Sequence, residues 1–564
     1  MQLRRLKVEN FRGIRAADWS IPSEMVALIG VGDAGKSTIL SSIELALYPH
    51  WNPPLSDDDF HNLDSERPIR IEATVGALPS SLCAERKFGL DLRGLSPQGV
   101  LNDEPEEEDE FVLTIRFELD ASLEPQWLVV NDRLPEGRHI GARDRAACGM
   151  VRLGTSPDRH LGWRRGSALE RLTQGGDETS RALADAHRKM REAINSARLE
   201  ELDDVIEQAR LAATQMGAGG VSDSLRPALE AAEASRARAL SLHADDIPLS
   251  QSGLGTRRLI ALGLERLVVP TGAIMLVDEI ESGLEPFRLR HLLSVLRDLV
   301  ATPDSGQVFF TTHSPIAVSE LEPSELHVVR ARDGDVEVRQ TPNKLRRQLR
   351  STPEAFLARR VIVCEGKTEI GICRALASEW PARHDSRPLG HTGTALALGG
   401  GSQTAKRALG LADLGYSVIV FADSDRDLDP GPEALHEAGV AVVQWEDRMA
   451  TEDRVIADLP LAGLQELLEV AMEEWGDSQV LDALQARVPG DVKLGGSELE
   501  SWIQEGLREE VLRAAFCAAA KRKEWFKRVD LGRRMGEVLF TYADELGCKD
   551  TWEKLEQLRE WAYA

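Results

Sequence analysis

Apolar and polar positions follow β-strand patterns along the first 165 residues. Residues 3–11 alternate, and the apolar run at residues 25–30 leads through a glycine-rich turn into a helical pattern that ends near residue 48. Further strands are predicted at residues 68–76, 111–119 and 127–131. We therefore expect this segment to be rich in β-structure after its first helix.

The pattern becomes helical between residues 166 and 243. This stretch is rich in Ala, Glu, Arg and Leu, and a glycine-rich interruption at residues 217–220 divides it. We expect an all-helical insertion that serves as a dimerisation arm. The alternative is a helical subdomain that packs on its own chain.

An α/β pattern returns at residues 244–345 and would complete the domain that the insertion interrupts. It comprises a glycine-rich loop, predicted strands at 273–277 and 307–311 around a helix at 288–300, and a small hairpin at 326–340. After a basic junction, residues 346–564 favour a second α/β domain with a C-terminal helical region. Its strands are predicted at residues 361–364, 417–421 and 440–444.

The composition fits a globular chain that does not cross a membrane. Hydrophobic residues make up 42% and charged residues 29% of the 564 positions. No stretch reaches the ~18 apolar residues of a membrane span, and the N-terminus lacks the apolar region of a signal peptide. The six cysteines have no paired metal-ligand spacing, so a reducing cytoplasm is the expected location.

Charge is unevenly distributed along the chain. The formal net charge is −25, which argues against non-specific binding of nucleic acid by the protein as a whole. The most acidic run, residues 103–110, is expected to be a solvated loop. The most basic runs are residues 344–350 and 521–534, and the second supplies the positive field that a nucleic-acid partner requires.

A phosphate-binding loop follows the apolar run at residues 25–30. Residues 30–37 fit the pattern G-x-x-x-x-G-K-[ST] between a predicted strand and a predicted helix. Lys36 would reach the β- and γ-phosphates of ATP, and the Ser37 hydroxyl would bind Mg²⁺. The predicted ATP-binding residues of this loop are Gly30, Gly32, Asp33, Ala34, Gly35, Lys36, Ser37 and Thr38.

Further motifs complete the predicted ATP site. The strand at 273–277 ends in Asp278 and Glu279, which places one acid near Mg²⁺ and the other where it can polarise the attacking water. His313, after the next strand, is predicted to sense the γ-phosphate. A Ser/Gly-rich loop can present N–H groups to a phosphate through Ser252, Gly253 and Gly255.

The order of these motifs resembles the ABC-type ATPases, particularly the SMC-like branch. Residues 10–13 (Asn-Phe-Arg-Gly) also resemble the opening strand and turn of that branch. The resemblance implies that the signature loop of one protomer closes on ATP held by the other, and hence a homodimer or higher homo-oligomer. The chain departs from the usual LSGGQ signature, which leaves Ser250 and Ser252 as alternatives, and it has no evident Q-loop glutamine.

Carboxylates follow the predicted strands of the second α/β domain. Glu365 ends the first strand and Glu369 lies four residues later, so both can face one site. Asp423 and Asp425 follow the second strand, and Glu452 comes after the third. Crowded acids repel one another unless cations neutralise them, and such oxygen ligands suit Mg²⁺ or Mn²⁺. Two ions could stabilise both the attacking and the leaving oxygen of a phosphodiester.

This arrangement resembles the Toprim domain of topoisomerases, bacterial primases and certain nucleases. An SMC-like ATPase followed by Toprim is similar to the OLD (overcoming lysogenization defect) family of ATP-dependent nucleases, in whose broad group the Gabija nuclease subunit falls. The resemblance covers residues 1–315 and 360–530. It implies an α/β fold: an ABC-type P-loop ATPase with an inserted helical dimerisation arm, then a Rossmann-like Toprim domain with helical additions.

The resemblance also implies roles for individual residues. Metal ligation at the second site would fall to Glu365, Glu369, Asp423 and Asp425, assisted by a later acid and a lysine. Glu452 best matches the acid, with Asp453 as the alternative. The lysine that stabilises the pentavalent phosphate is assigned to Lys527, with Lys521 and Lys523 as alternatives.

The sequence thus predicts an ATP-binding and ATP-hydrolysing, metal-dependent DNA endonuclease, and the family implies a role in phage defence. A topoisomerase would need a nucleophilic tyrosine in a strand-passage module, and a primase would need a zinc element; neither is evident. The alternative from a different class is an ATP-switched repair scaffold or clamp without nuclease activity. The sequence leaves open the DNA specificity, the sign of the ATP effect, dimer versus tetramer, and the need for a partner protein from a neighbouring gene.

Overall fold

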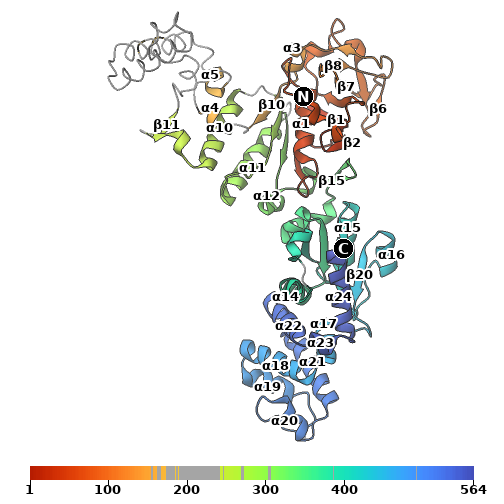
Figure 1. Cartoon of the computed structure of the whole chain (residues 1–564), viewed down its shortest axis with the longest axis vertical. Helices are drawn as coiled ribbons and strands as arrows, with labels where there is room; N and C mark the ends of the chain where they lie inside the picture. The colour runs from red at the N-terminus through yellow and green to blue at the C-terminus, as the bar shows by residue number, and fades with distance from the viewer. Residues whose placement is uncertain are drawn as a thin grey trace, which may run out of the picture.

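The structure, a computed structural model, describes residues 1–153, 157–161, 167–172, 242–244, 247–268, 272–302, 306–384, 387–490 and 492–564, together with positions 185 and 189. Figure 1 shows a large unit that carries the N-terminus, a smaller sheet below it, and a helical region at the far end. The last helix returns to the smaller sheet, so the C-terminus lies beside that sheet.

The large unit is built on a mixed sheet with fourteen strands in the described ranges. Its order is β10-β13-β14-β3-β15-β16-β2-β1-β4-β7-β5-β6, and β8 and β9 branch from β7. The pairs from β10 to β15, and β16 with β2, are parallel. The strands are β1 (Gln2–Phe11), β2 (Ile14–Ser20), β3 (Met25–Ile29), β4 (Ile69–Gly76), β5 (Arg93–Leu95), β6 (Leu101–Asn102), β7 (Glu110–Leu119), β8 (Gln126–Val129), β9 (Arg138–His139), β10 (Met150–Leu153), β13 (Ile274–Val277), β14 (Gln307–Thr311), β15 (Leu326–Arg332) and β16 (Asp335–Gln340).

Helices cover both faces of the central strands. In β3, Val26 and Leu28 face the core that contains α1, whereas Ala27 and Ile29 face the core that contains α11 and α12. Successive side chains of a strand point to opposite faces, so an apolar strand such as β3 requires both helical layers. The main helices of this unit are α1 (Lys36–Ala46), α3 (Ala142–Ala146), α10 (Leu254–Val268), α11 (Pro286–Val300) and α12 (Pro315–Glu320).

The smaller sheet is parallel throughout, in the order β18-β17-β19-β20. In β17, Val361 and Val363 face the core that also contains α11, whereas Ile362 and Cys364 face a core formed with the C-terminal helices. The smaller sheet is therefore buried on both faces and shares one core with the large unit. Its strands are β17 (Arg360–Cys364), β18 (Thr394–Leu398), β19 (Ser417–Ala422) and β20 (Ala441–Gln444).

A half-buried arginine joins the two units. The guanidinium of Arg330, in β15, lies 3.7 Å from the ring centroid of Tyr416, which immediately precedes β19. The Tyr416 hydroxyl donates to the carbonyl oxygen of Phe356 at 2.6 Å. Burial lowers the pKa of Arg330, and the aromatic face offsets part of that cost by a cation–π contact.

Helices complete the second half of the chain. They are α13 (Arg346–Ser351), α14 (Lys367–His384), α15 (Thr404–Asp413), α16 (Pro432–Glu437), α17 (Thr451–Asp458), α18 (Leu461–Trp475), α19 (Asp477–Gln485), α20 (Leu499–Gln504), α21 (Glu509–Lys523), α22 (Val529–Thr541), α23 (Ala543–Leu546) and α24 (Asp550–Tyr563). None of the described helices is long and apolar enough to span a bilayer.

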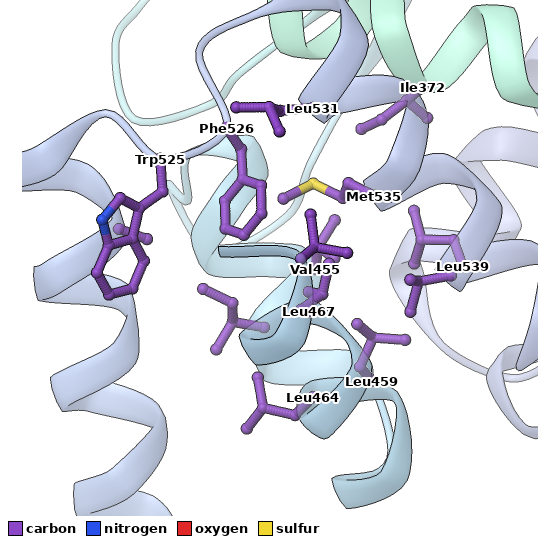
Figure 2. Packing of buried hydrophobic residues seen from close by; sticks show 14 of the residues in the cluster. Ile372, Val455, Leu459, Leu464, Leu467, Trp525, Phe526, Leu531, Met535 and Leu539 are labelled. Carbon is purple, nitrogen blue, oxygen red and sulfur yellow. The ribbon is translucent and has the colours of Figure 1, made fainter. Parts of the chain in front are cut away.

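Glycines allow α14 and α22 to approach closely. A Cβ atom added at Gly532 would lie 2.6 Å from the carbonyl oxygen of Thr368, and one added at Gly371 would lie 2.4 Å from that of Val529. Figure 2 shows Met535, from the same helix as Gly532, packed near Val455 of α17 in the adjoining core. The backbone contact therefore fixes α22, and the chain that leads into it, against the helix that begins after Glu365.

The strands predicted from the sequence are present, with small shifts at their ends, and the α/β class is confirmed. Strand β18 was not predicted, because its Thr-Ala-Leu-Ala-Leu sequence carries few β-branched residues. The predicted helical insertion at 166–243 lies outside the described residues, apart from residues 167–172, positions 185 and 189, and the end at 242–243. The predicted domain boundaries remain predictions.

We expect Gly532→Ala to lower the free energy of unfolding by about 1–3 kcal/mol, because the added methyl group would overlap the backbone of α14. Gly263→Ala in α10 is the matched control: no described atom lies within 4 Å of the added carbon, and alanine favours a helix interior by up to ~1 kcal/mol. Urea unfolding followed by circular dichroism compares the two. Equal stability of both variants would contradict the close helix contact.

Candidate functional site

The phosphate loop connects β3 to α1 through two glycines in unusual backbone conformations. Gly30 has φ of +151°, and a Cβ there would lie 2.5 Å from the carbonyl oxygen of Val329, so only glycine fits. Gly35 has φ of +91° and caps α1. The buried Lys36 ammonium donates to the carbonyl oxygens of Gly30 at 3.1 Å and Val31 at 2.7 Å. Burial lowers the pKa of Lys36, and a phosphate bound in the loop would stabilise the charged form of this side chain.

Asp278 is the centre of a hydrogen-bond network at the end of β13. Its carboxylate accepts from the Ser37 hydroxyl at 3.1 Å and from the Thr311 hydroxyl at 2.6 Å. Arg152 donates to its other oxygen at 3.1 Å and also pairs with Glu44 at 2.6 Å. The structure thus brings together Ser37 and Asp278, the two predicted Mg²⁺ ligands of the ATP site.

Arg152 and Thr311 were not identified from the sequence. Arg152 precedes Asp278 by 126 positions and reaches it only because β10 pairs with β13. Thr311 ends β14, the other neighbour of β13. To identify both residues from the sequence, one would have needed the sheet order, which places β10 and β14 on either side of β13.

The predicted water-activating acid and switch histidine lie in adjacent loops. Glu279 has a left-handed backbone with φ of +46°, a strained conformation for a non-glycine residue. Its N–H donates to the Thr311 hydroxyl at 2.7 Å, and its carboxylate accepts from Ser282 at 3.0 Å. The exposed His313 is positioned through its backbone N–H, which donates to Glu281 at 2.6 Å.

The Ser/Gly-rich loop packs against the turn that follows Glu279. A Cβ at Gly255 would lie 2.1 Å from the carbonyl oxygen of Gly283, so the two segments touch through their backbones. Arg258 of α10 donates to the carbonyl oxygen of Asp278 at 2.7 Å and to that of Ser282 at 3.3 Å. Within the described ranges no hydrogen bond joins Ser252 or the glycines of this loop to the phosphate loop.

Three acids of the second domain meet at the carboxyl ends of β17 and β19. The N–H of Asp423 donates to Glu365 at 3.0 Å. The Thr451 hydroxyl lies 2.6 Å from an oxygen of Glu369 and 2.6 Å from an oxygen of Asp423. We refer to Glu365, Glu369, Asp423 and Thr451 as the acidic cluster. Thr451 was not singled out from the sequence, because a threonine at a helix start has many other uses.

The acids of this cluster repel one another. Burial, together with the charge of Asp423, raises the pKa of Glu365 and that of Glu369 to about 7. Burial also raises the pKa of Asp423. Within the described part of the chain, none of these three carboxylates forms an ion pair with a lysine, arginine or histidine. Hard divalent cations would supply the missing positive charge.

The remaining predicted ligands lie at the edge of the cluster. Asp425 is exposed, and the buried Glu452 lies 3.4 Å from the hydroxyl of Thr368. Among the described residues, no three His, Cys, Asp or Glu side chains are arranged as a ready metal site. The donor atoms are all oxygens and carry unbalanced negative charge, which fits Mg²⁺ or Mn²⁺. In this structure the carboxylates accept hydrogen bonds from the Thr451 hydroxyl and the Asp423 N–H instead.

The candidate lysines differ in their contacts. Lys521 forms an ion pair with Asp453. Lys527 is exposed, and its charge acts on Glu452, whose pKa burial raises. Lys523 is exposed at the end of α21. The structure therefore brings Lys527 near the preferred acid, Glu452, and Lys521 to the alternative acid, Asp453.

The phosphate loop, the Asp-Glu strand and the mixed sheet around them define an α/β P-loop ATPase fold. A family model described as an AAA domain, putative AbiEii toxin, Type IV TA system, matches residues 147–319, which contain Asp278, Glu279 and His313. The chain is 27% identical over 348 residues to the OLD nuclease of Thermus scotoductus, and the match spans 58% of this chain and 62% of that protein. The resemblance to the OLD family is thereby confirmed.

Two solved SMC heads are also similar. The SmcHead bound to the C-winged helix domain of ScpA has 14% sequence identity and a TM-score of 0.35, covering 60% of this chain and 97% of that chain. The SMC head domain from Thermotoga maritima has 14% identity and a TM-score of 0.31, covering 61% of this chain and 100% of that chain.

In the metal-free protein, we expect the free energy of unfolding to fall as the pH rises from about 4.5 to about 7. Glu365 and Glu369 hold their protons up to about pH 7 when folded, but only to their ordinary value of 4.5 when unfolded. Protonation therefore stabilises the fold below that range, and this stability is lost as the pH rises through 7.

Urea unfolding in EDTA, at about pH 5 and about pH 8, measures this dependence. Glu369→Gln removes one of the groups whose pKa is raised and should reduce the difference in unfolding free energy between the two pH values. Glu354→Gln, which changes an exposed acid in the turn at residues 353–357, is the control. An unchanged difference in Glu369→Gln would contradict the raised pKa.

Proposed function

We propose that this protein binds and hydrolyses ATP and cuts DNA in a metal-dependent reaction at the acidic cluster. The observation that supports this most is the meeting of Glu365, Glu369 and Asp423 at one sheet edge, where none of them forms an ion pair with a residue that the structure describes. Such a group of hard oxygen donors favours divalent cations. The similarity to an OLD nuclease supports the same class of reaction.

At the ATP site, Lys36 would exchange its own loop's carbonyl oxygens for the β- and γ-phosphates. Ser37 and Asp278, already hydrogen-bonded at 3.1 Å, would hold Mg²⁺, and Glu279 would polarise the attacking water. Ser252, Gly253 and Gly255 of a second protomer would close over the nucleotide, with His313 near its γ-phosphate. The protein would then act as a homodimer or a higher homo-oligomer.

At the acidic cluster, Glu365, Glu369, Asp423 and Asp425 would hold two Mg²⁺ or Mn²⁺ ions, with Glu452 or Asp453 as a further acid. When bound, such ions activate water and stabilise the leaving oxygen of a phosphodiester. Thr451 would align two of the carboxylates, because its hydroxyl lies within hydrogen-bond distance of both. Lys527 would stabilise the negative charge that develops on the phosphate.

The proposed organisation assigns residues 1–165 and 244–345 to the ATPase, 166–243 to dimerisation and 346–564 to a Toprim nuclease domain. ATP would control the geometry of the oligomer and the access of DNA. Phage defence in the cytoplasm is the setting that the family resemblance supports, and a partner protein from a neighbouring gene fits that setting.

Supercoiled plasmid incubated with the purified chain and Mg²⁺ or Mn²⁺ should be nicked or cut. Glu365→Ala and Asp423→Ala should each reduce the rate by at least about 100-fold, because each removes a proposed metal ligand. Asp427→Ala changes an exposed acid whose ion pair in the described part of the chain is with the exposed Arg448, and it should retain activity. Full activity in both cluster variants would exclude this site, and no cutting by the parent protein would favour the ATP-switched scaffold.

Lys36→Ala should weaken ATP binding about 10- to 100-fold, since it removes a charge-assisted hydrogen bond to the phosphates. Glu279→Gln should bind ATP normally but retain it unhydrolysed. Calorimetry and a phosphate-release assay measure the two effects, with the exposed Glu285→Gln as control. Normal turnover in Glu279→Gln would show that this residue does not activate the water.

A further inference from the structure

The basic run at the end of α21 and the start of α22 contains two kinds of cation. Most of its members are paired with acids: Lys521 with Asp453, Arg528 with Glu474 and Asp530, Arg533 with Glu537, and Arg534 with Glu473. Arg522, Lys523 and Lys527 form no ion pair within the described ranges. Pairing therefore leaves three available positive charges within this described run, in a chain whose formal net charge is −25.

The three unpaired cations lie on one rigid corner, which we define as residues 522–527. Helix α21 ends at Lys523, and Glu524 turns the chain with a left-handed φ of +53°. Trp525 and Phe526 then anchor the corner in the core, with 2% and 0% of their surfaces exposed. Figure 2 shows Phe526 pointing into this core near Leu531 and Met535. The buried anchors leave only the charged side chains of the corner in solvent.

A hydrogen bond connects the corner to Thr368, the residue that precedes Glu369 of the acidic cluster. The hydroxyl of Thr368 donates to the carbonyl oxygen of Phe526 at 2.9 Å and lies 3.4 Å from Glu452. Thr368 directly precedes Glu369 in α14. The corner therefore has a fixed place beside the carboxylates, and the glycine contact between α14 and α22 holds it there.

We propose that Arg522 and Lys523, together with Lys527, bind the sugar-phosphate backbone of the DNA strand that the acidic cluster cuts. This inference rests on the proposed nuclease function and adds the surface that holds the substrate. Unpaired cations gain free energy when they release the counterions of a nucleic acid, whereas cations already neutralised by acids gain less. The corner exposes no large apolar side chain, which disfavours a protein partner, because protein interfaces depend on apolar and aromatic anchors.

The experiment measures binding of a fluorescent DNA duplex by the full-length chain carrying Asp423→Ala, so that cutting does not interfere. The test variant adds Arg522→Gln and Lys523→Gln, and the matched control adds Arg533→Gln and Arg534→Gln. The slope of log affinity against log salt should decrease by about 2 in the test variant. Its affinity at low salt should fall about tenfold, while the control changes by less than half as much.

A third variant combines Arg522→Gln with Lys523→Arg, so that it keeps one of the two positive charges that the test variant lacks. It should recover half of the salt slope that the test variant loses. Thermal unfolding checks that all variants are folded. An unchanged slope in the test variant, or an equal loss in the paired control, would overturn the proposal. An unchanged DNA slope with weakened self-association would instead make the corner a protein interface.

The two proposals can fail separately. If the parent protein cuts plasmid but the corner variant binds DNA as before, the corner proposal is wrong and the nuclease proposal stands. If no protein cuts plasmid but the corner variant loses DNA binding, the corner binds DNA and the nuclease proposal is wrong.

Discussion

Acidic side chains at the ends of parallel strands need positive charge nearby, and the two sites of this protein meet that requirement differently. Asp278, after β13, has the guanidinium of Arg152 at 3.1 Å and accepts from two hydroxyl groups. Glu365 and Asp423, after β17 and β19, have hydrogen-bond donors but no ion pair in the described chain, and burial raises their pKa values. At the first site the protein itself supplies a positive charge, whereas at the second the cations of our proposal would supply it.

The crowding of acids at the second site depends on how the smaller sheet packs between its two apolar cores. Parallel pairing of β17 with β19 brings their carboxyl ends to one edge, and the alternation of β17 buries both of its faces. One face belongs to the core of the large unit, where Arg330 packs on Tyr416. The acids therefore cannot move apart without disturbing two apolar cores, so their repulsion persists in the folded protein.

The sequence predicted most of the motifs that are formed by residues close together in the chain. The phosphate loop, the Asp-Glu strand and the acids after β17 and β19 were all identified, because each combines a strand with its own loop. Arg152 and Thr451 were not identified, since each acts on residues distant in the chain, at positions fixed by sheet order and helix packing. Strand β18 was missed because its own residues have little preference for a strand. Its extended conformation is stabilised by pairing with β17, which the sequence does not show.

The same distinction applies to charge. A basic run in the sequence shows how many cations are close together, but only the folded chain shows which of them already have partners. Arg533 and Lys523 both belong to the run at residues 521–534, yet one pairs with Glu537 along its helix and the other extends from a helix end. A cation held by a neighbouring acid gives up that attraction to bind a phosphate, whereas an unpaired one does not. The pairing pattern, rather than the density of basic residues, therefore decides which cations of the run at residues 521–534 we propose for binding DNA.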